Sequence, residues 1–174
     1  QTPQSLSVST LSSGLDTPWD LAWGPDQMIW VTERKGTISR VDPTNGERRQ
    51  VGQVDAFELS ESGLMSMAFH PEFGTQPFVY LVYSYRDGSG IRNRLIRMTY
   101  NGVSLSNPET LLEGIPGASN HDGSRLAVGP DGLLYMTTGD ASEAALAQSL
   151  SSLAGKVLRL NLDGTPAFDN PFGS

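Results

Sequence analysis

The sequence contains no cysteine, which excludes disulfide bonds, thiolate nucleophiles and zinc sites built on sulfur. It contains no run of basic residues either, and its 12 Lys and Arg are outnumbered by 19 Asp and Glu. This acidic balance makes nucleic acid and anionic membrane surfaces poor partners. The longest apolar stretches, such as residues 78–83, are far too short to span a bilayer.

No secretory signal peptide is recognisable, although the first residues give a hint of export. The chain opens on Gln1-Thr2-Pro3 rather than on Met, and a polar, Ser-rich stretch extends to Ser13. We expect residues 1–14 to be the lead-in of a processed, exported protein. The expected location is periplasmic or extracellular.

The most informative feature of the sequence is an internal repeat. A short apolar strand, a turn with proline and a longer strand recur three times, with prolines 46 and 59 residues apart at Pro25, Pro71 and Pro130. A third strand follows each time and ends in a glycine turn, and the turns are Asn45-Gly46, Asn101-Gly102 and Asp163-Gly164. Such pairs adopt positive φ at little cost and favour hairpins.

The expected fold is all-β, because each repeat carries three strands and the first two add a more polar fourth strand. Four-stranded antiparallel units of this length are typical of β-propeller blades. We predict three blades, at about 15–58, 59–117 and 118–174, and the last is incomplete. An irregular antiparallel sandwich is the alternative.

Equivalent positions in the three repeats give a sharper expectation. Trp23, Phe69 and Val128 end the first strand of each repeat, and we expect all three to point into the packing between blades. Because propellers close with about four to eight blades, three blades leave two apolar faces uncovered. We expect the missing blades to come from the rest of a longer chain or from a second copy.

Only two histidines are present. His70 occupies a repeat position that the other units fill with glycine, which favours a turn or packing role. His121 lies in the loop that leads into the first strand of the third blade. Such loops lie at the mouth of a propeller channel, so His121 is the candidate catalytic residue, with a plain surface histidine as the alternative.

A family resemblance gives His121 a role. The ordered motifs include Pro18-Trp19-Asp20-Leu21-Ala22-Trp23, His70-Pro71-Glu72-Phe73, His121-Asp122-Gly123-Ser124-Arg125-Leu126, Thr138-Gly139-Asp140 and Leu153-Ala154-Gly155-Lys156-Val157-Leu158-Arg159. From Leu15 to Phe172 the chain resembles the front half of the soluble quinoprotein glucose/sorbosone dehydrogenases. The resemblance implies a six-bladed propeller that binds pyrroloquinoline quinone (PQQ) and calcium and oxidises the anomeric hydroxyl of an aldose sugar to a lactone.

The resemblance also assigns residues. His121 matches the general base that removes the sugar hydroxyl proton, a task suited to imidazole near neutral pH. Asp140 matches a carboxylate beside that histidine, which could fix the ring tautomer. From the residues alone, Asp140 could equally be a turn cap after a strand.

The sequence departs from the family at the positions that face the cofactor. Glu61 stands where the best-known members carry a glutamine, Asn120 where they carry an aspartate, and Ala145 near a second expected glutamine. The family's calcium-binding carbonyls belong to the half that has no counterpart here. We therefore expect no quinone binding by this chain alone and predict no metal ligand in it.

Three functional hypotheses remain. The first is that the chain is part of a PQQ-dependent sugar dehydrogenase. The second is a propeller of the same superfamily that has lost redox activity and serves as a binding or interaction module, which Glu61 and Ala145 favour. The third, a calcium-dependent hydrolase or lactonase, has no specific support in the sequence.

Overall fold

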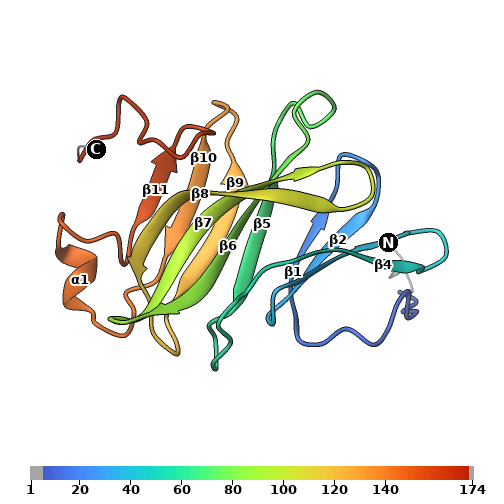
Figure 1. The fold of residues 1–174 in the computed structure, drawn as a ribbon, viewed down its shortest axis with the longest axis horizontal. Coiled ribbons are helices and arrows are strands. Elements are labelled where there is room, and N and C mark those ends of the chain that lie inside the picture. Colours follow the sequence, from blue (N-terminus) through green and yellow to red (C-terminus); the bar gives the residue numbers. More distant parts are fainter. Residues whose placement is uncertain (1–5, 173–174) are drawn as a thin grey trace, which may run out of the picture.

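The computed structural model describes residues 6–172 and consists of three antiparallel sheets that lie side by side (Figure 1). Residues 1–5 of the predicted lead-in and residues 173–174 of the predicted third blade lie outside the described residues. The first sheet contains β1 (Pro18–Trp23), β2 (Ile29–Glu33), β3 (Thr37–Val41) and β4 (Arg48–Gln53). The second contains β5 (Leu64–Phe69), β6 (Phe78–Asp87), β7 (Gly90–Tyr100) and β8 (Leu105–Pro116), and the third contains β9 (Gly123–Val128), β10 (Leu134–Thr138) and β11 (Val157–Leu160).

The prediction of an all-β fold of propeller blades is confirmed, since each repeat forms its own sheet with strands in sequence order. The sheets do not merge into one sandwich, and the third has three strands within the described residues. One short helix, α1 (Ala145–Gln148), was not predicted. The boundaries between blades stay a prediction, although each sheet falls within its predicted range.

Two apolar clusters hold the sheets together. One fills the space between the first and second sheets, and it includes Trp30, Ile38, Leu81 and Met98. The other lies between the second and third sheets, around Tyr80, Leu95 and Met136. Because β5 contacts both β1 and β9, the first strands of the three sheets are neighbours along the molecule.

The side chains of these first strands follow one rule. Phe69 of β5 packs against the cluster shared with the first sheet, and Val128 of β9 packs against the cluster shared with the second. Both therefore face the preceding blade. Ala22 and Ala68, one position earlier in their repeats, pack against the clusters shared with the following blade. Successive side chains of a strand point to opposite faces, which explains the alternation.

The expectation for Trp23 is wrong for the described chain. Its side chain is 63% exposed, and Leu21 on the same face is 59% exposed. Residues at this repeat position face the preceding blade, as Phe69 and Val128 do. No sheet precedes β1 in the described residues, so nothing there covers Trp23. Trp23 is equivalent to Phe69 and Val128 in position, and it lacks the neighbour that buries them.

A buried carboxylate joins all three sheets. Asp20 on β1 is 2% exposed, and it accepts hydrogen bonds from the Ser66 hydroxyl (2.7 Å) and the Met67 main-chain N–H (3.0 Å) of β5. Arg125 of β9 donates to the same carboxylate at 2.6 Å. The Ser66 hydroxyl oxygen accepts the main-chain N–H of Leu126 in turn. Asp20 therefore fixes the spacing of the three first strands.

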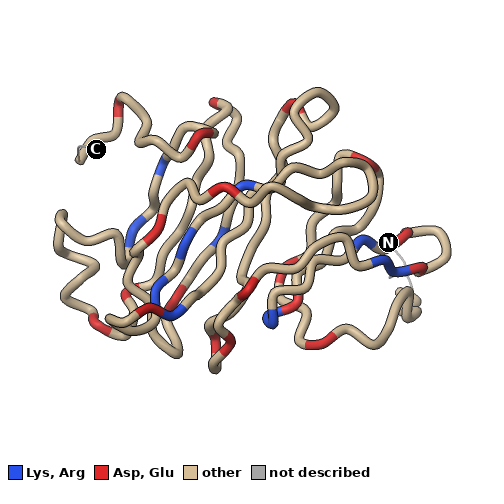
Figure 2. Tube along the Cα trace, in the orientation of Figure 1, with Lys and Arg blue, Asp and Glu red and all other residues tan. Residues whose placement is uncertain are grey.

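Charges of both signs are scattered over the three sheets and their loops, as Figure 2 shows. On the middle sheet, Arg94 pairs with Glu113 at 3.4 Å and Arg97 with Glu109 at 2.6 Å. Within residues 6–172, no helix is long and apolar enough to cross a membrane.

Replacing Asp20 by Ala should destabilise the fold, because the buried Ser66 hydroxyl and Met67 N–H would lose their acceptor. The expected loss is about 2–4 kcal/mol in the free energy of unfolding, measured by urea denaturation. The exposed Asp55 provides the control, since D55A should change stability by less than about 0.5 kcal/mol. Equal effects of the two substitutions would contradict the role of Asp20.

The exposed face of β1 should make the 174-residue chain associate when it is produced by itself. Replacing Leu21 and Trp23 together by Ser should shift sedimentation towards the monomer, because these side chains form the uncovered apolar face. A wild-type chain that sediments as a monomer at high concentration, without binding an apolar dye, would refute this expectation.

Candidate functional site

The predicted site residues meet where three loops converge. Glu61 lies between β4 and β5, His121 between β8 and β9, and Asp140 directly after β10. The His121 main-chain N–H donates to Glu61 Oε2 at 2.8 Å, and its Nδ1 lies 3.0 Å from Asp140 Oδ1. The structure therefore brings together residues that are 60 and 19 positions apart in the chain.

The local backbone at this point is unusual. His121, Ala141 and Ser142 all have φ between 55° and 61°, the left-handed region that side chains other than Gly rarely adopt. The two loops are also in close contact, because a Cβ atom at Gly139 would lie 1.6 Å from the His121 carbonyl oxygen. Such strained conformations persist only where the surroundings determine them, and they concentrate at functional sites.

The His121–Asp140 contact has a clear chemical consequence. With Nδ1 donating to the carboxylate, Nε2 is the ring nitrogen that remains free to accept a proton. The His121 side chain is 58% exposed, whereas that of Asp140 is 27% exposed. Asp140 Oδ1 also accepts the Ser142 main-chain N–H at 2.9 Å, which holds the carboxylate in place. The pair can therefore act as an oriented base that substrate can reach.

Asn120 and Glu61 flank this pair. The Asn120 side-chain oxygen accepts the Ser142 hydroxyl at 2.8 Å, and the Glu61 main-chain N–H donates to the Ser119 carbonyl. Ala145 is the first residue of α1 and is exposed. Glu61 and Asn120 thus lie beside His121, where the resemblance expects cofactor contacts.

Sequence reasoning missed Asp122, which follows the candidate base. Its side chain is 1% exposed, and its Oδ1 accepts the Asn93 side-chain N–H (3.0 Å) and the Ala118 main-chain N–H (2.9 Å). Burial raises the pKa of Asp122 above its ordinary value, and the nearby charge of Glu61 adds to that rise. The sequence gives no indication that a charged residue in this loop motif is buried.

The charges at the site bear on the expected cofactor. The hydrogen bonds and ion pairs of Glu61, Asn120, His121 and Asp140 involve no Lys or Arg of the part that the structure describes. PQQ carries three carboxylates, and two carboxylates already lie beside His121. Residues 6–172 also contain no group of three or more His, Asp or Glu side chains that could hold a metal. By themselves, the four site residues therefore do not balance the negative charge of the cofactor.

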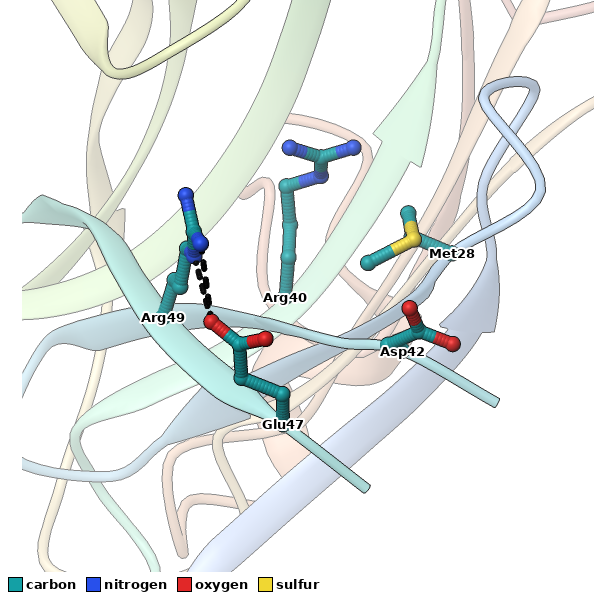
Figure 3. A pocket seen from close by; sticks show the side chains of 5 residues that line it. All are labelled: Met28, Arg40, Asp42, Glu47 and Arg49. Carbon is teal, nitrogen blue, oxygen red and sulfur yellow. Dashed lines mark hydrogen bonds and ion pairs between the residues drawn. The ribbon is translucent and has the colours of Figure 1, made fainter. Parts of the chain in front are cut away.

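Two hollows lie away from this site. Figure 3 shows a polar one of about 150 Å3 on the first blade, lined by Met28, Arg40, Asp42, Glu47 and Arg49. Within this lining Arg49 contacts Glu47 at 2.8 Å, whereas Arg40 contacts Asp26, which lies outside the lining, at 2.7 Å. The larger hollow, about 600 Å3, lies on the third blade beside Leu150, Val157 and Phe172. None of the four predicted site residues lines either hollow.

His70 lies in a packed environment instead. It is 6% exposed, its ring stacks on Tyr80, and its Nδ1 accepts the Glu72 main-chain N–H at 3.1 Å. This placement agrees with a packing role. Burial lowers the pKa of His70 below its ordinary value, opposed by the charge of Glu72 and assisted by that of Arg97.

Comparison with known proteins gives a consistent result. Residues 15–174 match the family model described as Glucose / Sorbosone dehydrogenase. The chain is 35% identical to quinoprotein glucose dehydrogenase B of Acinetobacter calcoaceticus, covering 97% of this chain and 42% of that protein. It is also 28% identical to the human Hedgehog-interacting protein, covering 90% of this chain and 26% of that protein.

Solved structures agree with the sequence matches. The PQQ-bound aldose sugar dehydrogenase of Streptomyces coelicolor superposes with a TM-score of 0.86 at 37% identity, covering 94% of this chain. A putative oxidoreductase (glucose dehydrogenase) of Thermus thermophilus gives 0.89 at 39% identity, covering 97% of this chain. This chain spans half the length of each of those two chains.

The lowered pKa of His70 predicts a pH dependence of stability. A histidine that stays neutral in the folded state stabilises the fold above the unfolded pKa of about 6.5, and this contribution is lost as pH falls towards the folded pKa. In the H70N variant the amide oxygen can still accept the Glu72 N–H. The excess stability of the wild type over H70N, measured by urea denaturation, should therefore shrink between about pH 7 and pH 5. A constant or growing excess would contradict this assignment.

Proposed function

Since the chain belongs to the glucose/sorbosone dehydrogenase family, we propose that it is part of a PQQ-dependent aldose sugar dehydrogenase in which His121 is the general base. The observation that carries the proposal is the 3.0 Å contact between His121 Nδ1 and Asp140 Oδ1. It supports an oriented imidazole at the place where the family motif expects one. The sugar substrate and the periplasmic or extracellular location are parts of the same proposal.

The proposed chemistry is a two-electron oxidation at the anomeric carbon. His121 Nε2 takes the proton of the anomeric hydroxyl, and Asp140 stabilises the imidazolium that forms. The anomeric hydrogen leaves with its electron pair, and the sugar becomes a lactone. PQQ, when bound, supplies the two-electron acceptor for this reaction.

The remaining blades have a defined task in this proposal. Because Glu61 and Asp140 place negative charge beside His121, we propose that blades outside residues 6–172 supply cationic groups and the calcium that balance the quinone carboxylates. Glu61 and Asn120 would line the cofactor without neutralising it. Blades that follow in a longer chain, rather than a second copy, are the proposed source, since this chain spans half the length of the solved relatives.

A binding module without redox activity is the second candidate. Glu61 cannot donate the hydrogen bond of a glutamine amide while it is ionised, and Ala145 offers no polar group to a cofactor. The 28% identity to the Hedgehog-interacting protein supports the idea that this propeller type also serves recognition. A full-length protein that binds a partner and shows no PQQ-dependent turnover would favour this candidate.

Replacing His121 by Gln in the full-length protein should lower kcat by about 10²–10⁴-fold, the usual contribution of a positioned general base. KM should change far less, because the imidazole acts mainly in the transition state. The measurement is steady-state sugar oxidation with added PQQ and calcium. The 174-residue chain by itself should show little or no turnover under the same conditions.

His70 provides the matched control, since it is the other histidine and lies outside the site. The H70N variant should lose stability and keep its turnover per folded molecule. Full turnover of H121Q would refute the assignment of the base, and equal losses in H121Q and H70N would point to a folding defect.

A further inference from the structure

The loop that carries His121 is held by a buried polar chain that begins in the neighbouring blade. Ser84 of β6 donates to the Asn93 side-chain oxygen at 2.7 Å, and Asn93 of β7 donates from its amide nitrogen to Asp122 Oδ1 at 3.0 Å. Ser84 and Asn93 are fully buried, and Asp122 is 1% exposed. Three polar side chains in this setting carry a large desolvation cost, which their hydrogen bonds offset.

Asp122 fixes the loop at both of its ends. Its Oδ1 accepts the Ala118 main-chain N–H at 2.9 Å, which closes the turn before His121. Its carbonyl oxygen accepts the Gly139 N–H at 3.0 Å, which draws the loop towards Asp140. The arrangement is tightly packed at Gly117, where a Cβ atom would lie 2.9 Å from Asp122 Oδ1 and 3.0 Å from the Asn93 amide nitrogen.

The second oxygen of the Asp122 carboxylate adds no hydrogen bond to the core that the structure describes. Asp122 Oδ2 is buried and has no hydrogen-bond partner among residues 6–172, and unsatisfied buried oxygens are uncommon in folded proteins. Only the Oδ1 acceptor is used, and it joins the buried Asn93 of β7 to the main chain of the His121 loop. The residue it secures, His121, adopts a left-handed backbone with φ of 59° and a side chain that is 58% exposed. Few apolar contacts are available to such a side chain, so polar tethers must set its position.

We propose that Asp122 and Asn93 are positioning residues, which hold the His121 imidazole against Asp140 across the junction between the second and third blades. Neither residue touches substrate. The proposal deepens the proposed function, on which it rests for the role of His121 as base. Through Asn93, it assigns the second blade a part in catalysis. Asn93 belongs to none of the site motifs in the sequence.

The test is the tautomer of His121, read from the nitrogen-15 shifts of its imidazole in the full-length protein. The signals are identified by their loss in H121Q. In the wild type Nδ1 should carry the proton at neutral pH, because it donates to Asp140. In D122A, which loses the Oδ1 acceptor, the Nδ1–H pattern should give way to that of a free histidine. In D122N the amide oxygen still accepts both bonds, so the wild-type pattern should persist.

Activity provides a second readout. D122A should lower kcat for sugar oxidation by about 10²-fold with little change in KM, as expected for a misplaced catalytic group, and D122N should recover most of this loss. The control is V82A, which opens a cavity at the buried Val82 of the same blade interface without touching the loop. It should lower stability and leave the His121 tautomer unchanged.

The possible outcomes are distinct. If D122A does not fold, N93A tests the same tether by removing one of its two donors, and a loss of the Nδ1–H pattern supports the proposal. An unchanged tautomer in a folded D122A or N93A overturns it, as does an equal change in V82A. Failure of the proposed function would appear differently, as full turnover in H121Q with the tautomer result unaffected.

Discussion

The packing of one blade face on the next is the constraint on which the rest of this structure depends. The clusters around Leu81 and Leu95 bury the apolar faces that meet between neighbouring sheets. Asp20 adds the polar part of this packing, because its buried carboxylate bonds to β5 and β9 at once. Apolar area supplies most of the stability, while the directional bonds of Asp20 set the spacing.

The candidate site is a product of that spacing. Glu61 lies in the connection between the first and second sheets, His121 in the connection between the second and third, and Asp140 after β10 of the third. His121 contacts Glu61 at 2.8 Å and Asp140 at 3.0 Å. A shift of one blade by a fraction of this distance would break the tether on the His121 main chain. The same dependence explains why a strained left-handed residue can persist in an exposed loop, since neighbours on both blades determine its conformation.

Much of the fold could be predicted from the sequence, because each repeat is visible in a short stretch of the chain. The repeated strand pattern and the glycine turns predicted three units, and each of the three sheets lies within its predicted range. Trp23 shows the limit of this reasoning, since repeat position predicts the direction of a side chain and not whether a neighbour covers it. The site was predicted from motifs and resemblance, which supplied His121 and Asp140. Asp122, Asn93 and Ser84 could not be found in this way, because burial across a blade junction is a property of the assembled sheets.

The central claim is that two blades together orient His121 as a base towards a sugar hydroxyl. A crystal structure of the full-length protein with a bound aldose tests it most directly. The account predicts the anomeric hydroxyl oxygen within about 2.6–3.2 Å of His121 Nε2, with Nδ1 still on Asp140. A sugar bound elsewhere on the propeller, with His121 Nε2 facing only solvent, would contradict it.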